Sequence, residues 1–339
     1  MRTEKSIMRE VSMDSAKSLN PTTRPTYIPV IFDTDIGCDI DDTWALVYFI
    51  LIGGFDPLLV TSERGNSEYR LRIVARMLGI LERDAIPLGY GAPRVKGDRE
   101  LEPQRPWVRG FPLGRYSGKI HRDGVGALIE TVMSSPEEVS VVTIGPLTNI
   151  ARAIEREPRI ANRMRLYSMA GSIYEGLADG SAPYPETNVR KDIGAARYVL
   201  ESGVRLAISP IESAKRIMVG GESYMKLRES RNLAIKGLLE TYRIWTTHPI
   251  IVKRNPPDPG KASTALYDVQ AVYMASIGGA ENPRCENPYF ETEEIRIRID
   301  AQGYSRLDPH GYAVTCATRW KDLDGFIDHF TGVLCSVPS

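Results

Sequence analysis

The stretch VIFDTDIGCDIDD, residues 30–42, indicates both the fold class of the chain and the position of a functional site. It opens with three apolar residues that favour a buried strand, and the next ten residues include five aspartates, at positions 33, 35, 39, 41 and 42. Ligands of open α/β sheets bind beyond the carboxyl ends of the strands, so this acidic cluster predicts a functional site. It holds more carboxylates than a helix cap needs, and a hard divalent cation such as Ca²⁺ or Mg²⁺ would offset their mutual repulsion.

The cluster does not match an EF-hand calcium loop. Such a loop starting at Asp33 needs glycine at its sixth position and glutamate at its twelfth, where this chain has Cys38 and Trp44. The sequence therefore predicts a metal site formed at the end of a strand.

Apolar runs of strand length alternate with segments of helical spacing over most of the chain. Strands are expected at 29–32, 58–61, 86–88, 139–144, 165–169 and 204–209, and helices at 42–52, 68–78, 123–133, 147–157, 192–201, 233–246 and 266–277. This alternation predicts one large Rossmann-like α/β domain with a mostly parallel central sheet flanked by helices. Strand patterns at 293–300 and 312–318 add a small antiparallel C-terminal part, followed by a helix over 323–334.

Composition limits the remaining possibilities. Residues 1–27 form a polar stretch without a secretory signal and are expected to be a flexible extension of a domain spanning 28–339. The 43 basic and 43 acidic side chains balance, which argues against a nucleic-acid or membrane partner. The four cysteines are widely spaced, so neither a disulfide framework nor a zinc site is expected, and a reducing cytoplasm is the default location.

The run DTDIGCDIDDTWAL, residues 33–46, resembles the opening motif of the inosine-uridine-preferring nucleoside hydrolase family. Further segments resemble later family motifs in the same order, namely IGPLTN at 144–149, MAG at 169–171, ETN at 186–188 and YD at 267–268. The resemblance implies a hydrolase that cleaves the N-glycosidic bond of ribonucleosides to free base and ribose. It also implies a Ca²⁺ cofactor, a small nucleoside substrate and a homodimer or homotetramer.

By this resemblance, Asp35, Asp42, Asp268 and the backbone carbonyl of Ile144 would ligate Ca²⁺. These four groups leave room for water and two sugar hydroxyls in a shell of six to eight oxygens. The family's catalytic base is the aspartate just before the helical ligand, which here is Asp41. This chain has two more residues between the glycine and the Asp-Asp pair than the commoner pattern, so Asp39 is the alternative base.

Substrate contacts are also implied by the resemblance. Asn66, Glu186 and Asn188 would contact the ribose, although Asn66 is also suited to cap a helix and the other two to lie on a loop surface. Tyr267 stands where some relatives carry the histidine that protonates the leaving base, and a phenol is a weaker acid at neutral pH. His121 lies near where relatives place a pocket histidine, and His248 is a second candidate proton donor. Five aromatic residues are candidates for stacking on the base: Trp107, Tyr116, Tyr184, Tyr242 and Trp245.

Two other functions compete with nucleoside hydrolysis. A calcium-dependent nucleoside or sugar binder on the same fold would bind without turnover, and Tyr267 in place of histidine is compatible with it. A haloacid-dehalogenase-type phosphatase would use Asp33 as nucleophile and Asp35 as its partner. The second alternative leaves the Asp41-Asp42 pair and the IGPLTN segment unexplained.

Overall fold

The computed structural model describes residues 27–63, 65–92, 101–278 and 287–336. Within these residues a ten-stranded sheet has the order β4-β3-β2-β1-β5-β6-β7-β10-β8-β9. Neighbouring strands pair in parallel except at β8, which is antiparallel to β10 and β9. The strands are β1 (Ile28–Thr34), β2 (Phe55–Ser62), β3 (Leu88–Gly89), β4 (Ile120–His121), β5 (Val139–Thr143), β6 (Met164–Met169), β7 (Arg205–Ser209), β8 (Phe290–Ile299), β9 (Ser305–Leu307) and β10 (Tyr312–Trp320).

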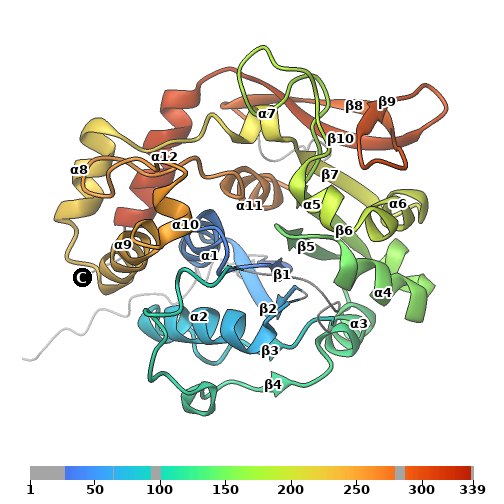
Figure 1. Cartoon of the computed structure of the whole chain (residues 1–339). Coiled ribbons are helices and arrows are strands. Elements are labelled where there is room, and N and C mark those ends of the chain that lie inside the picture. The colour runs from blue at the N-terminus through green and yellow to red at the C-terminus, as the bar shows by residue number, and fades with distance from the viewer. Residues whose placement is uncertain (1–26, 64, 93–100, 279–286, 337–339) are drawn as a thin grey trace, which may run out of the picture.

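Helices cover both faces of the sheet (Figure 1). One hydrophobic cluster joins the sheet to α1 (Asp41–Leu51), α2 (Ser67–Ile80), α8 (Gly221–Glu229), α9 (Leu233–Thr246), α11 (Val269–Ser276) and α12 (Leu323–Cys335). A second cluster joins it to α3 (Gly124–Ser134), α4 (Thr148–Arg156) and α6 (Ile193–Glu201). The short helices are α5 (Thr187–Lys191), α7 (Ile211–Ala214) and α10 (Pro249–Val252).

Strand β1 lies at the point where the strand order reverses. It pairs with β2 on one side and β5 on the other, and Asp33 is in register with both Thr61 and Thr143. All five residues of β5 are buried, as expected for a central strand of a parallel sheet covered by helices on both faces. The chain leaves β1 directly into the acidic segment, so the fold places this segment at the position where open α/β sheets bind ligands.

The predicted fold class is confirmed, with differences in detail. The antiparallel part is continuous with the main sheet, because β10 pairs in parallel with β7 and only β8 is antiparallel to its neighbours. The sequence pattern did not predict α8, which has few apolar residues, or the three-residue strand β9. Most of the predicted N-terminal extension lies outside the described residues, so the domain boundary stays a prediction.

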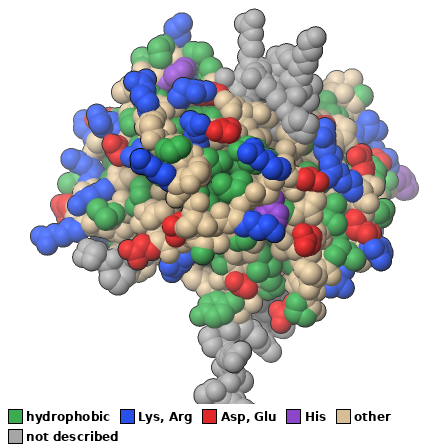
Figure 2. Space-filling view, turned by 90° about the horizontal axis from the view of Figure 1, so that it is seen from below, with side chains coloured by type: hydrophobic (Ala, Val, Ile, Leu, Met, Phe, Trp, Pro, Cys, Tyr) green, Lys and Arg blue, Asp and Glu red, His purple; other side chains and the backbone are tan. Residues whose placement is uncertain are grey.

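Side chains of both charges reach the surface of the molecule. On the face seen in Figure 2, basic and acidic side chains are scattered among one another. Among the described helices, none combines the length and the apolar character needed to cross a bilayer.

Candidate active site

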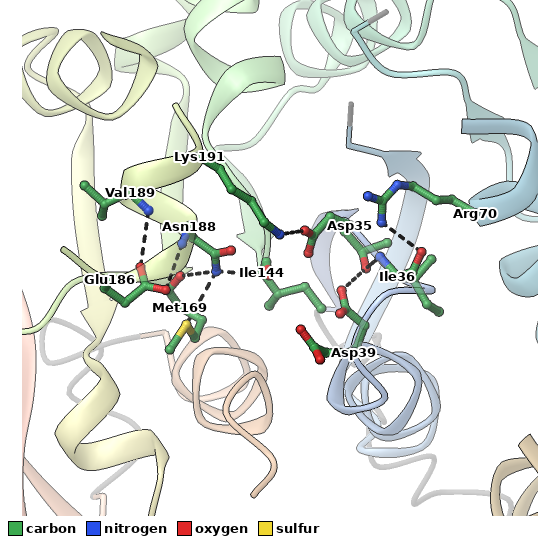
Figure 3. A network of polar contacts seen from close by, with 12 residues as sticks. Asp35, Ile36, Asp39, Arg70, Ile144, Met169, Glu186, Asn188, Val189 and Lys191 are labelled. Carbon is green, nitrogen blue, oxygen red and sulfur yellow. Dashed lines mark hydrogen bonds and ion pairs between the residues drawn. The ribbon is translucent and has the colours of Figure 1, made fainter. Parts of the chain in front are cut away.

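A cavity of about 210 Å³ opens at the carboxyl ends of β1, β5, β6 and β7. Six of its lining residues are acidic and two are basic, and the remainder include apolar side chains and two tyrosines. The lining comprises Asp35, Asp39, Asp41, Asp42, Ile144, Met169, Leu177, Tyr184, Glu186, Thr187, Asn188, Lys191, Ile211, Arg254, Tyr267 and Asp268. The tertiary structure thus brings residues from positions 35 to 268 into one site, part of which is shown in Figure 3.

Three buried carboxylates, Asp41, Asp42 and Asp268, lie next to one another, with one oxygen of each within 4.8 Å of the others. Asp41 and Asp42 form the first turn of α1, and Asp268 precedes the first residue of α11. The positive ends of two helix dipoles therefore point toward these acids. We call these three residues the acid trio.

The acid trio is electrostatically costly without a cation. Burial, followed by the nearby charge of Asp39, raises the pKa of Asp41 to about 8. Burial and neighbouring aspartates also raise the pKa values of Asp42 and Asp268 well above their ordinary values. Three carboxylates that each offer an oxygen within 4.8 Å of the others form the donor set that a hard dication prefers. The residues present therefore fit a metal site of the calcium type.

Thr34, the last residue of β1, orients one member of the trio. Its hydroxyl donates to Asp42 Oδ1 at 2.6 Å and accepts from the backbone N–H of Ile36 at 3.0 Å. This bond fixes one oxygen of Asp42, so the carboxylate is held in place before any ligand arrives.

Asp35 has a different environment from the acid trio. The Lys191 Nζ atom lies 2.5 Å from Asp35 Oδ2 (Figure 3). Burial alone would raise the pKa of Asp35, but the positive charges of Lys191 and Arg70 outweigh it, and the pKa is lowered. Of the predicted ligands, the structure brings Asp42 and Asp268 together with Asp41, while Asp35 faces a lysine.

The segment between Gly37 and Asp41, where the sequence predicts two additional residues, is anchored at several points. Gly37 has a φ of 116°, which favours glycine, and a side chain there would collide with the Tyr69 ring. The Tyr69 hydroxyl donates to the Gly37 carbonyl at 2.9 Å, and the Trp245 indole N–H donates to the Cys38 carbonyl at 3.0 Å. Trp245, a candidate for base stacking, therefore holds this loop from α9.

The two candidate bases occupy different positions. The Asp39 side chain is 49% exposed and forms an ion pair with Arg254 at 3.0 Å, while the Gln104 amide donates to its backbone carbonyl at 3.0 Å. Asp41 is buried beside Asp42 in the acid trio. Both side chains line the cavity, but Asp41 lies deep in it and Asp39 lies at its rim.

Glu186 and Asn188 line the cavity and also organise its backbone. The Glu186 carboxylate accepts from the backbone N–H groups of Gly171, Asn188 and Val189. Burial raises the pKa of Glu186, although these three donors oppose the shift. The Asn188 amide donates to the carbonyls of Met169 at 3.0 Å and Ile144 at 3.3 Å, so it touches the carbonyl predicted as a metal ligand.

Tyr267 lines the cavity beside the acid trio. Burial, followed by the charge of Asp41, raises the pKa of its phenol, which therefore stays protonated at neutral pH. Of the five aromatic residues considered for stacking, Tyr184 is the one among the lining residues.

Three predicted residues lie elsewhere. The Asn66 side chain caps α2 by accepting from the Tyr69 N–H at 3.2 Å, and it lines a separate cavity of about 290 Å³. His121 is on the edge strand β4, and His248 caps α10. None of the three is among the residues that line the acidic cavity, and their predicted substrate contacts stay predictions.

The sequence pattern did not predict Lys191 and Arg254 as site residues. Lys191 ends helix α5, which begins at the Glu186-Thr187-Asn188 motif, so its closeness to this motif could have indicated a place in the site. Arg254 had no such signal, because only the packing of α10 brings it to the rim.

Comparison with known proteins agrees with the geometry. The family model described as inosine-uridine preferring nucleoside hydrolase matches residues 30–324. A probable uridine nucleosidase 2 of Oryza sativa subsp. japonica is 26% identical over 297 residues, covering 82% of this chain and 80% of the relative. The pyrimidine-specific ribonucleoside hydrolase RihA of Citrobacter koseri is 29% identical over 220 residues, covering 60% and 67%.

Solved structures show the same fold. A plant nucleoside hydrolase, PpNRh1, superposes with a TM-score of 0.74 at 18% identity, covering 91% of this chain and 99% of that one. The inosine-uridine preferring nucleoside hydrolase of Bacillus anthracis superposes with a TM-score of 0.71 at 19% identity, covering 91% and 100%. With a family match over most of its length, the chain belongs to the inosine-uridine preferring nucleoside hydrolase family and is an enzyme of that class.

Proposed function

We propose that the protein hydrolyses the N-glycosidic bond of ribonucleosides to free base and ribose, using Ca²⁺ as cofactor and Asp41 as the base. The observation that carries the proposal is the acid trio, three buried carboxylates brought together at the end of the sheet. Family membership supports ribonucleosides as the substrate class, and two similar proteins are named for uridine and for pyrimidine ribonucleosides.

The ligands would be Asp42, Asp268, Asp35 and the carbonyl of Ile144, all of which line the cavity. Ca²⁺ held by these groups would supply a positive charge that lowers the pKa of a nearby water and would favour oxygen ligands such as the sugar hydroxyls. The hydrogen bond from Thr34 keeps Asp42 in a fixed orientation for that role.

Asp41 is better placed than Asp39 to accept the proton of the attacking water. It is buried beside Asp42, whereas Asp39 is half exposed and paired with Arg254. Burial raises the pKa of Asp41 to about 8, and a neighbouring dication would favour its ionised, basic form. A base with a pKa near the working pH is effective in general-base catalysis.

The remaining cavity groups suit the charges that develop in the reaction. Positive charge grows on the ribose in an oxocarbenium-like transition state, and the buried carboxylate of Glu186 lines the cavity that would hold it. The protonated Tyr267 phenol would donate a hydrogen bond to the departing base, but its raised pKa argues against full proton transfer.

The phosphatase alternative fits the geometry poorly. Asp33 would have to act as the nucleophile, yet it is fully buried and is not among the residues lining the cavity. Its Oδ1 accepts from Thr61 at 2.5 Å and from Asn149 at 2.7 Å, which ties together β1, β2 and the start of α4. Asp33 is therefore better explained as a structural acid.

The decisive experiment measures ribose release from a panel of ribonucleosides in the presence of Ca²⁺. The wild type should release reducing sugar, the Asp42→Ala variant should not, and the matched surface variant Asp56→Ala should behave as the wild type. Equal release by the wild type and Asp42→Ala would refute the proposal. Calorimetric binding of a nucleoside without any turnover would favour the non-catalytic binder instead.

A further inference from the structure

The proposed function gives no role to Lys191, the lysine that lines the acidic cavity. Lys191 ends helix α5, and its side chain is 32% exposed and lines the cavity. Its Nζ atom lies 2.5 Å from Asp35 Oδ2, one of the carboxylates assigned to the metal. The Lys191 ammonium therefore already binds one oxygen of a carboxylate that is proposed as a metal ligand.

A second buried cation supports the same side of the cavity. The Arg70 guanidinium, from α2, donates to the Ile36 carbonyl at 2.9 Å and lies close enough to lower the pKa of Asp35. Arg70 is 3% exposed and holds the backbone next to Asp35, whereas Lys191 is partly exposed and lines the cavity. Lys191 is thus the cation of the two that a metal ion entering the cavity would meet.

Resting on the proposed function, we propose that the Lys191 ammonium is an internal competitor of the metal ion. It holds one oxygen of Asp35 in the metal-free protein, and Ca²⁺ would have to displace the ammonium from this carboxylate or bind beside its charge. The chain consequently binds Ca²⁺ more weakly than it would with an uncharged residue at position 191.

The reason is electrostatic. An ammonium and a dication that share one carboxylate repel each other, and the low dielectric of a partly buried cavity strengthens that repulsion. Asp35 is a single carboxylate with two oxygens, one of which is already bonded to the ammonium. The acid trio lies next to this pair and, among the described residues, forms no ion pair of its own. The dication would therefore enter at the trio and then compete for Asp35.

Isothermal titration of the full-length protein with CaCl₂ alone, at pH 7.5 and fixed ionic strength, tests this proposal. The Lys191→Met variant keeps the length of the side chain and removes the charge, and it should bind Ca²⁺ at least about tenfold more tightly than the wild type. Lys191→Arg keeps the charge and should stay within about threefold of the wild type. Lys261→Met removes a surface charge outside the cavity and serves as the matched control.

The outcomes separate this inference from the proposed function. Unchanged or weaker Ca²⁺ binding by Lys191→Met, with a wild type that binds, would overturn the competition and leave the calcium site intact. Absence of Ca²⁺ binding in both proteins would remove the cofactor from the proposed function and this inference with it. If circular dichroism shows that Lys191→Met does not fold, Lys191→Gln, which can still donate to Asp35, takes its place with the same expected tightening.

Discussion

Two groups of carboxylates line the same cavity, and their environments differ. The acid trio is buried with acids as its nearest charged neighbours, and the pKa values of its members are raised. Asp35 is equally buried, but Lys191 and Arg70 face it and its pKa is lowered. Burial favours a raised pKa in both groups, but at Asp35 the ion pair with Lys191, together with the charge of Arg70, outweighs it. Among the described residues, the members of the trio form no ion pair with a lysine or arginine, whereas Asp35 does, and this difference accounts for the opposite pKa directions.

The largest expected effect separates the two candidate bases. Asp41→Asn removes the acid beside Asp42 while keeping its shape, and we expect kcat for ribose release to fall about a hundredfold to ten-thousandfold. Asp39→Asn is the matched control, with an expected loss of less than about tenfold, because Asp39 lies at the rim and pairs with Arg254. Steady-state kinetics on one ribonucleoside decides between them, and the reverse ranking would assign the base to Asp39.

Tyr267→Phe tests the group next to the trio. The phenol is protonated, so it acts as a hydrogen-bond donor, and one such bond is worth about tenfold in rate. We expect kcat to fall by about that factor, with little change in the pH profile. Loss of the alkaline or acid limb of that profile in Tyr267→Phe would show that Tyr267 transfers a proton, contrary to this prediction.

Stability against pH distinguishes the trio from Asp35. The raised pKa of Asp41, about 8, means that the unfolded chain loses this proton at lower pH than the folded one, so metal-free stability falls as pH rises from 5 to 8. Asp35 contributes in the opposite direction, and only in the acid range at and below its ordinary pKa. Thermal unfolding in chelator should show a fall in Tm of roughly 5 °C or more over this range.

Calcium should reverse this trend, because carboxylates must be ionised to bind the metal and the stabilisation by Ca²⁺ grows as they ionise. The Asp41→Asn variant is the control, since residue 41 can no longer titrate and the metal-free curve should become shallower. A metal-free Tm that rises between pH 5 and 8 would contradict the charge assignment of the trio.

The last expected effect is on metal affinity rather than on rate, and it concerns the hydrogen bond that orients Asp42. Thr34→Val removes the 2.6 Å hydrogen bond to Asp42 Oδ1 with almost no change in volume. The buried oxygen loses its donor, at a cost of about 1–3 kcal/mol. In the presence of Ca²⁺ this cost should appear as weaker metal binding, measured by titration calorimetry. Unchanged affinity would mean that Asp42 does not depend on Thr34 for its orientation.

Much of the fold was predictable from local pattern. The apolar run before Asp33 and the helical spacing after Asp42 locate β1 and α1 within a few residues, and the buried run 139–144 locates β5. Helix α8 was missed because it has few buried residues, Tyr224 and Leu227, and therefore a weak apolar pattern. The continuity of β10 with β7 was also missed, since strand pairing across distant segments is not encoded in periodicity.

The site was predictable in part, because several of its residues belong to recognisable motifs. Asp35, Asp42, Glu186, Asn188 and Asp268 carry motif signals, and all of them line the cavity. Asn66 and His121 carried comparable signals but do not line it. A motif specifies which residue types are present, whereas the direction of each side chain depends on packing.

The sequence alone determined that acids follow a buried strand of a mostly parallel sheet, because hydrophobic period and chain order are local properties. The structure added that this strand lies where the strand order reverses. Only the tertiary structure decided which of the acids lie next to a basic side chain. Lys191 and Arg70 meet Asp35, while Asp268 joins Asp41 and Asp42, across separations of more than 200 residues in the last case. Charge interactions act through distance in space rather than along the chain, so the electrostatic division of the cavity exists only after folding.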